Sequence, residues 1–181
     1  MSDYILTYSR IKFYPLEPAM GDIRIEDIAH SLSLMTRANG HSSHFYSVAQ
    51  HSLQCCREAE SRGYSVRVQL GCLLHDASES YISDLTRPVK RNLPEYFKIE
   101  ETLQKLIYVR FGLGDLTADE LKQIENVDDT LLHYEFAAMM DYQIFEKAPA
   151  KSLKDYDFAQ RDFISVEEEF LAAFNKLMSC R

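Results

Sequence analysis

The sequence contains few of the residues that mark specialised folds. It has no Trp, 6 Gly, 5 Pro and 4 Cys in 181 residues. The cysteines Cys55, Cys56, Cys72 and Cys180 form no C-x-x-C pair, which excludes a disulfide framework and a thiolate zinc knuckle. Internal repeats, low-complexity tracts and linkers rich in Pro, Gly and Ser are also missing. We therefore expect one domain over residues 1–181.

Long apolar runs and an excess of basic residues are missing as well. No stretch approaches the roughly 18 apolar residues that cross a bilayer, and the first fifteen residues lack the pattern of a secretory signal. The 20 Lys and Arg face 28 Asp and Glu, a net charge of −8. Such a surface repels a nucleic-acid backbone but allows a small phosphorylated ligand in a locally positive pocket. We expect a cytoplasmic protein that binds neither membranes nor nucleic-acid polymers.

The spacing of apolar residues predicts an all-α fold of about six helices. Tyr4 to Tyr14 alternates loosely, which predicts a short strand or hairpin before the helices. The expected helices start at Ile25 with a stop at Gly40, cover 43–62, 65–81 and 94–111, and begin at two capping boxes, Thr117-x-x-Glu120 and Ser165-x-x-Glu168. Residues 82–89 and the stretch around Pro149 are expected to be loops.

Chemically active residues gather in H-D-A-S-E-S-Y-I-S-D-L-T-R-P-V-K, from His75 to Lys90. His75, Asp76, Glu79 and Asp84 place one imidazole and three carboxylates within ten residues. The apolar run before His75 predicts burial, and buried carboxylates this close repel one another unless a cation lies between them. Imidazole with carboxylate suits a divalent transition metal better than Ca²⁺. A solvated polar face at a helix end is the alternative.

Two further segments complete a spaced pattern around this stretch. His51 lies in F-Y-S-V-A-Q-H-S, His75–Asp76 in L-L-H-D-A-S-E, and Asp128 in I-E-N-V-D-D-T-L-L-H-Y-E. With this pattern, residues 25–140 resemble the HD superfamily of metal-dependent phosphohydrolases, in particular the bacterial and phage branch related to 5′-deoxynucleotidases. The resemblance implies a helical HD-domain bundle in which His51, His75, Asp76 and Asp128 hold one divalent transition metal (Mn, Co, Zn, Fe or Ni). Asp129 is the alternative fourth ligand; Asp128 is preferred because Glu135 follows at the spacing seen in the family.

The resemblance also implies roles for neighbouring residues. Glu79 and Asp84 match carboxylates that lie beside the metal and orient and deprotonate the attacking water, and Arg37 matches an arginine that orients the phosphate. Arg37, Asp84, Thr86 and Lys90 are the expected substrate-binding residues. The structural alternatives are a surface charge for Glu79, a turn residue for Asp84, and solvated cations for Arg37 and Lys90.

The activity implied by the resemblance is release of phosphate from deoxyribonucleoside 5′-monophosphates. Ala38 stands where some of these enzymes have an aromatic residue against the sugar, so a dNTP triphosphohydrolase of the same fold is an alternative. A non-catalytic nucleotide sensor is an alternative of a different class, which predicts loss of a ligand position, whereas all four are filled. An apolar face around Phe170 and Phe174 is compatible with a homodimer.

Overall fold

The chain begins with a small antiparallel hairpin. In the computed structural model, which describes residues 3–181, β1 (Ile5–Leu6) pairs with β2 (Lys12–Phe13), with Ile5 opposite Phe13. Phe13 is fully buried and its ring stacks on that of Tyr81 with 4.0 Å between centroids. The predicted N-terminal hairpin is confirmed, and its second strand is anchored to the helical body.

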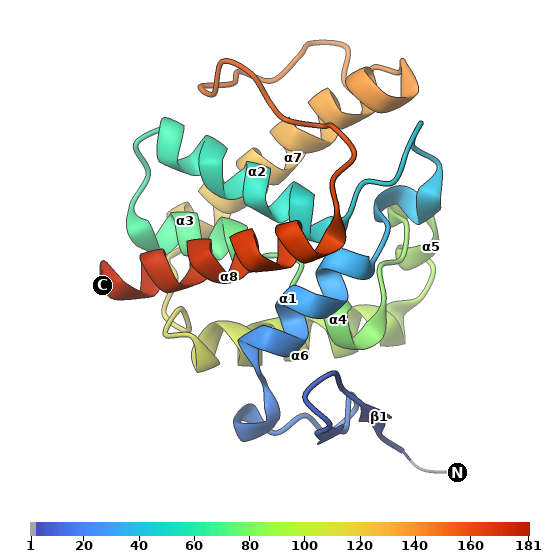
Figure 1. Ribbon diagram of the computed structural model, residues 1–181, viewed down its shortest axis with the longest axis vertical. Helices are drawn as coiled ribbons and strands as arrows, with labels where there is room; N and C mark the ends of the chain where they lie inside the picture. The colour runs from blue at the N-terminus through green and yellow to red at the C-terminus, as the bar shows by residue number, and fades with distance from the viewer. Residues whose placement is uncertain (1–2) are drawn as a thin grey trace.

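Helices make up the rest of the regular structure, as the all-α prediction requires (Figure 1). The number of longer helices matches the predicted six. They are α1 (Ile25–Leu34), α2 (Val48–Ser61), α3 (Val66–Leu74), α6 (Pro94–Arg110), α7 (Ala118–Met140) and α8 (Phe163–Ser179). Single turns form α4 (Glu79–Ile82) and α5 (Arg87–Lys90), and short 3-10 turns form η1 (Met20–Asp22) and η2 (Arg37–Gly40). None of the described helices combines the length and hydropathy needed to cross a membrane.

Capping side chains set where several helices begin. The predicted box at Thr117 and Glu120 is present at the start of α7. The predicted box at Ser165 is wrong: Asp162 caps α8, and its carboxylate accepts a hydrogen bond from the backbone N–H of Ser165 at 3.1 Å. The helix predicted from residue 43 starts at Val48, because Ser47 and Gln50 form a reciprocal capping box there.

Two predicted boundaries between Ser65 and Pro94 are also wrong. The helix expected over 65–81 stops at Leu74 and resumes as the single turn α4. The expected loop over 82–89 contains the start of α5, whose second residue is Pro88, a residue that fits the first turn of a helix. The break after Leu74 falls at the pair His75 and Asp76.

The central helix of the bundle is α3, which packs against α2, α7 and α8. Figure 1 shows α8 crossing in front of α3, with α2 beside it and α7 behind. Gly71 lets α3 and α7 approach closely: a Cβ at that position would lie 2.4 Å from Cδ1 of Ile124. The candidate residues His51, His75 and Asp128 therefore lie on or directly after three helices, α2, α3 and α7, that pack against one another.

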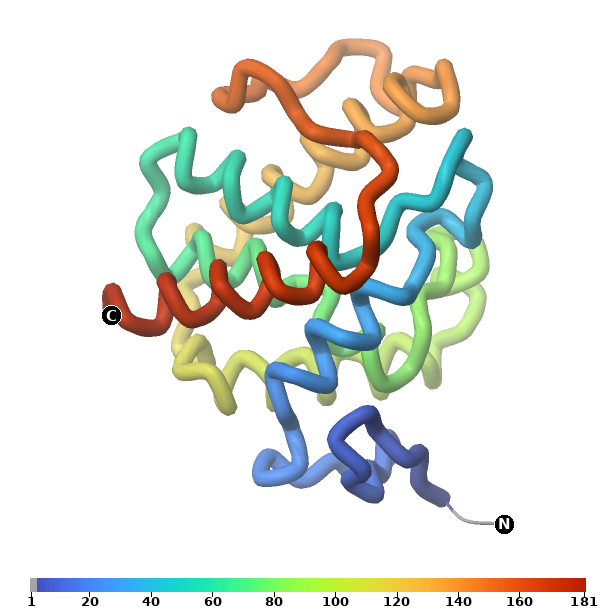
Figure 2. Tube along the Cα trace, in the orientation of Figure 1, coloured from blue at the N-terminus to red at the C-terminus, as the bar shows by residue number. Residues whose placement is uncertain are grey.

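A long segment without helix or strand, residues 141–162, joins α7 to α8 and passes over α2 (Figure 2). The buried carboxylate of Glu58 on α2 fixes it by accepting hydrogen bonds from the backbone N–H groups of Ser152 and Leu153, both at 2.8 Å, and from the hydroxyl of Tyr156 at 3.0 Å. This is the ordered loop expected around Pro149.

Candidate metal centre

The helix opens where the His-Asp pair lies. The backbone N–H groups of Ala77, Glu79, Ser80 and Tyr81 bond to the carbonyl three residues back, as in Ala77 to Leu74 at 3.0 Å. The side chain of Gln104 on α6 occupies the opening: its Nε2 donates to the carbonyl oxygen of Leu74 at 2.7 Å, and its Oε1 accepts from the N–H of Ser78 at 3.0 Å. Adjacent residues on a regular helix point about 100° apart, whereas here His75 and Asp76 face the same point.

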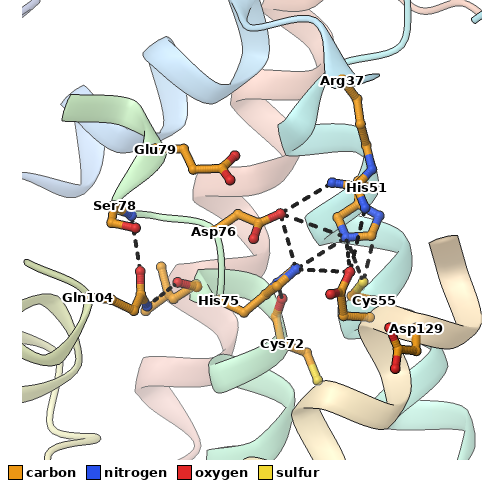
Figure 3. A network of polar contacts seen from close by, with 12 residues as sticks. Arg37, His51, Cys55, Cys72, His75, Asp76, Ser78, Glu79, Gln104 and Asp129 are labelled. Atoms are coloured by element: carbon orange, nitrogen blue, oxygen red, sulfur yellow. Dashed lines mark hydrogen bonds and ion pairs between the residues drawn. The ribbon is translucent and has the colours of Figure 1, made fainter. Parts of the chain in front are cut away.

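Four side chains converge on that point from three elements (Figure 3 shows His51, His75 and Asp76). Nε2 of His51 lies 3.2 Å from Nε2 of His75, 3.1 Å from Oδ1 of Asp128 and 3.9 Å from Oδ2 of Asp76. Nε2 of His75 lies 3.2 Å from Oδ2 of Asp76 and 3.6 Å from Oδ1 of Asp128. Ligand atoms bonded to one metal at about 2.1 Å are separated by about 3.0–3.4 Å, so this spacing fits a shared cation.

The hydrogen bonds of the two imidazoles orient their lone pairs toward one another. Nδ1 of His51 lies 2.6 Å from Oε1 of Glu135, and Nδ1 of His75 lies 2.8 Å from the carbonyl oxygen of Cys72. A carbonyl and a carboxylate accept hydrogen bonds, so each Nδ1 is the donor and each neutral ring presents an unprotonated Nε2. Two nitrogen lone pairs and two carboxylates then share a buried space, which is stable only with a cation between them.

The pKa shifts of His75, Asp76 and Asp128 also indicate that the cluster favours a positive charge. Burial alone would lower the pKa of His75, but the carboxylates of Asp76 and Asp128 outweigh it and raise that pKa well above its usual value. Burial acts against the charged form of Asp76 and Asp128 as well, yet the neighbouring imidazoles keep the pKa of both carboxyls below the ordinary range. The cluster therefore binds a positive charge, either a proton on His75 or a metal ion in its place.

The buried thiol of Cys55 lies beside the ring of His51. Sγ of Cys55 is 3.4 Å from Nε2 of His51, and one donor atom each from His51, Cys55 and His75 lie within 4.8 Å of one another. Burial raises the pKa of the Cys55 thiol well above its usual value, which favours the neutral thiol over the thiolate that metals bind. These residues can hold a metal ion, with the carboxylates as the charged partners.

Arg37 and Glu135 lie behind this cluster. The backbone N–H of Arg37 bonds to the carbonyl of Tyr46 at 2.9 Å, and the next residues, Ala38 and Asn39, both have a left-handed backbone with φ of 52°. Nε of Arg37 donates to Oε2 of Glu135 at 2.8 Å. Its terminal nitrogens lie 3.4 Å from Asp76 and 3.5 Å from Asp128. Arg37 thus reaches the cluster, as the sequence predicted, and contacts three carboxylates there.

Glu79 and Asp84 lie near Asp76. Oε2 of Glu79 is buried and has no hydrogen-bond partner within residues 3–181. Burial is the main cause that raises the pKa of Glu79 well above its ordinary value, reinforced by the charges of Asp76 and Asp84. Burial likewise raises the pKa of Asp84, which is half-buried. Both carboxyls therefore hold protons more strongly than surface carboxyls do.

The remaining expected residues are less closely associated with the cluster. Lys90 forms an ion pair with Glu100 at 2.6 Å and lies 3.6 Å from Glu79, so carboxylates already balance its charge. Thr86 is the N-cap residue of α5, and its side chain makes no capping bond. Asp129 is directed away from the imidazoles: its Oδ1 accepts from Arg87 at 3.1 Å. The structure therefore brings Asp128, and not Asp129, to the two histidines.

Arg87 is a residue of this site that the sequence analysis missed. Its Nη2 donates to Oδ2 of Asp128 at 3.1 Å, on the opposite side of that carboxylate from the histidines. A signal for it was present, since Arg87 stands inside the D-L-T-R-P-V-K run that follows the His-Asp pair. Glu135, noted in the sequence only for its spacing from Asp128, turns out to contact both His51 and Arg37.

A cleft of about 950 Å³ opens beside the cluster. His75, Asp76 and Asp128 lie at one end, and Phe97, Val109 and Leu121 supply apolar surface elsewhere in it. The basic residues Arg87, Lys90 and Arg91 of the α5 segment also line it. Arg37, Glu79, Asp84 and Thr86 are not among its lining residues within the described chain.

Comparison with known proteins gives likenesses of two kinds. No protein-family model matches the chain. It is 40% identical over 119 residues to the uncharacterised protein YfdR of Escherichia coli strain K12, and 37% identical over 122 residues to an uncharacterised protein of Rhodobacter capsulatus. These matches cover 66% and 64% of this chain and 64% and 62% of the relatives, so they span less than two thirds of either relative's length.

A more distant likeness covers the whole chain. The 5′-deoxynucleotidase of Yersinia pestis strain Pestoides F is 26% identical over 188 residues, which cover 100% of this chain and 80% of that protein. A protein of the same name from Yersinia pseudotuberculosis serotype O:3 matches equally. At this identity the comparisons support, at most, the broad family of HD-domain-like phosphohydrolases.

Proposed function

We propose that the chain is a metal-dependent phosphohydrolase that acts on nucleotides and releases phosphate from deoxyribonucleoside 5′-monophosphates. The observation that carries the proposal is the convergence of Nε2 of His51 and Nε2 of His75 with the carboxylates of Asp76 and Asp128, at N–N and N–O distances of 3.1–3.9 Å. The distant likeness to 5′-deoxynucleotidases supports the same activity class.

In this proposal His51, His75, Asp76 and Asp128 hold one divalent transition metal. The imidazoles and carboxylates suit Mn, Co, Zn, Fe or Ni better than Ca²⁺. When bound, the metal supplies positive charge for the phosphoryl oxygens and lowers the pKa of an attacking water. Asp76 and Asp128, with side chains 19% and 22% exposed, lie at the cleft and leave room for a phosphate there.

Glu79 serves as the proton acceptor for the attacking water. Its buried Oε2 has no hydrogen-bond partner among residues 3–181, and its raised pKa makes it a stronger base than an exposed glutamate. Asp84 assists in orienting that water and the sugar. Lys90, 3.6 Å from Glu79, limits how much proton affinity the burial of Glu79 produces.

Arg37 acts as a fixed positive charge behind the phosphate. Glu135 holds its Nε at 2.8 Å, so the guanidinium remains aligned with Asp76 and Asp128. A charge that is already in place stabilises the transition state without reorganisation during the reaction.

A deoxyribonucleoside triphosphate is the second candidate substrate. A cleft of about 950 Å³ with Arg87, Lys90 and Arg91 among its lining residues has room and positive charge for additional phosphates. A nucleotide sensor without activity remains the alternative of another class.

The test is a phosphate-release screen over dNMPs, NMPs and dNTPs, each with Mn²⁺, Co²⁺, Zn²⁺ or Ni²⁺. The proposal expects turnover of dNMPs that requires metal and is absent in Asp76→Ala. Turnover of dNTPs alone would select the second candidate. Nucleotide binding without any turnover would select the sensor and refute the proposal.

A further inference from the structure

The charges of the buried cluster leave little attraction for a phosphate. The carboxylates of Asp76, Asp128 and Glu135 together balance one divalent cation and the guanidinium of Arg37. A phosphate monoester carries about two negative charges at neutral pH. Another cation at the cleft is therefore needed to attract it to a chain whose net charge is −8.

Arg87 is placed to supply that charge. Its side chain is 51% exposed, compared with 14% for Arg37, and it lines the cleft together with His75, Asp76 and Asp128. It contacts Oδ2 of Asp128, whereas both histidines contact Oδ1. Arg87 therefore reaches the cluster from the open side without occupying the oxygen that faces the other donor atoms.

The guanidinium of Arg87 also has unused donors. It makes three hydrogen bonds within the described chain, one to Asp128 and two to Asp129, all at 3.1 Å. A guanidinium has five N–H donors, so two remain for a ligand. Asp129 is 39% exposed, and ion pairs with such exposed carboxylates contribute only about 0–1 kcal/mol. Phosphate can therefore replace Asp129 as the partner of Arg87 at small cost.

We propose that Arg87 is a substrate-binding residue that exchanges Asp129 for the phosphate of the nucleotide while keeping its contact with Asp128. The inference rests on the proposed function and adds to it a second arginine on the opposite side of the phosphate from Arg37. A guanidinium suits this role because its fork of donors matches two phosphate oxygens. Because Arg37 is bound to three carboxylates, Arg87 is the arginine of the pair that can change partners.

The test measures binding of inorganic phosphate to metal-loaded protein by calorimetry, and KM for the best nucleotide substrate. Arg87→Gln should raise both the dissociation constant of phosphate and KM by about tenfold or more, because a hydrogen bond to a charged group is lost. Metal content should stay at the wild-type level. Arg87→Lys should recover part of the binding, and it also serves if the glutamine variant folds poorly.

Lys105→Gln is the matched control, because Lys105 lines the same cleft but pairs with Glu101 at 2.7 Å. Unchanged phosphate binding and KM in Arg87→Gln would overturn the inference while wild-type turnover leaves the proposed function intact. Loss of metal in Arg87→Gln and Arg87→Lys would also overturn it, since Arg87 would then support Asp128 and not the substrate. Wild-type protein that binds metal but neither binds phosphate nor releases it would overturn both.

Discussion

Replacing Glu135 by Gln tests how strongly one buried carboxylate organises the candidate metal centre. Glu135 is 1% exposed, and its two oxygens accept from Nδ1 of His51 at 2.6 Å and from Nε of Arg37 at 2.8 Å. Glutamine has nearly the same shape but only one oxygen. Its amide N–H₂ would face either the N–H of His51 or the N–H of Arg37, and two donors cannot bond to each other.

The expected effect is on metal affinity. A carboxylate that accepts from a ligand histidine fixes the ring orientation and the tautomer that presents Nε2, and it raises the basicity of that nitrogen. Loss of such a partner typically weakens metal binding by about 10–100-fold, which corresponds to about 1.4–2.7 kcal/mol. We expect Glu135→Gln to fall in this range, whichever of its two donors the glutamine oxygen keeps.

The assay is competition between the protein and a chelator of known affinity for Zn²⁺ or Co²⁺. Asp129→Asn is the control. Asp129 directly follows Asp128 in the sequence, but its carboxylate contacts Arg87 and not the histidines. Wild-type affinity in Glu135→Gln, within about twofold, would refute the reasoning. So would a larger loss in Asp129→Asn than in Glu135→Gln.

Three further variants probe separate parts of the structure. Glu79→Gln should lower kcat by about 10²–10⁴-fold with normal metal content; an unchanged kcat would remove Glu79 from proton transfer. Burial would raise the pKa of Glu58, but the N–H groups of Ser152 and Leu153 outweigh it and lower that pKa. The charged carboxylate of Glu58 therefore stabilises the fold above its unfolded pKa, and this contribution is lost as pH falls through the lowered folded pKa. Glu58→Gln should lower the free energy of unfolding by about 1–3 kcal/mol at pH 7, and the stability measured by urea unfolding should then fall less as the pH is lowered. A pH profile equal to that of the wild type would contradict this. Gly71→Ala should lower the free energy of unfolding by about 1–3 kcal/mol, because its Cβ would overlap Ile124. A melting temperature equal to that of the wild type would contradict this.

Local sequence signals predicted the parts of the fold that depend on nearby residues. The capping box at Thr117 depends on residues within one turn, and it is found at the start of α7. The box at Ser165 failed because Asp162 offers a carboxylate three residues earlier and caps the helix first. Which of two candidate residues caps a helix depends on the path of the loop that precedes it.

Other features depend on residues far apart in the sequence. The helix break at His75 is stabilised by Gln104, which lies 30 residues beyond the Leu74 carbonyl that it bonds. The pairing of Arg87 with Asp128 joins positions 41 residues apart. No periodicity within a helix encodes such contacts, so the sequence analysis named the histidines and aspartates that converge here but missed the contact of Arg87 with Asp128.

Elemental analysis of protein purified without chelator tests the central claim most directly. The account predicts about one transition-metal ion per chain in the wild type and a large loss in Asp76→Ala and His51→Gln variants that remain folded by circular dichroism. Folded wild-type protein that contains no such metal, and that fails to bind added Mn²⁺, Co²⁺ or Zn²⁺, would contradict it.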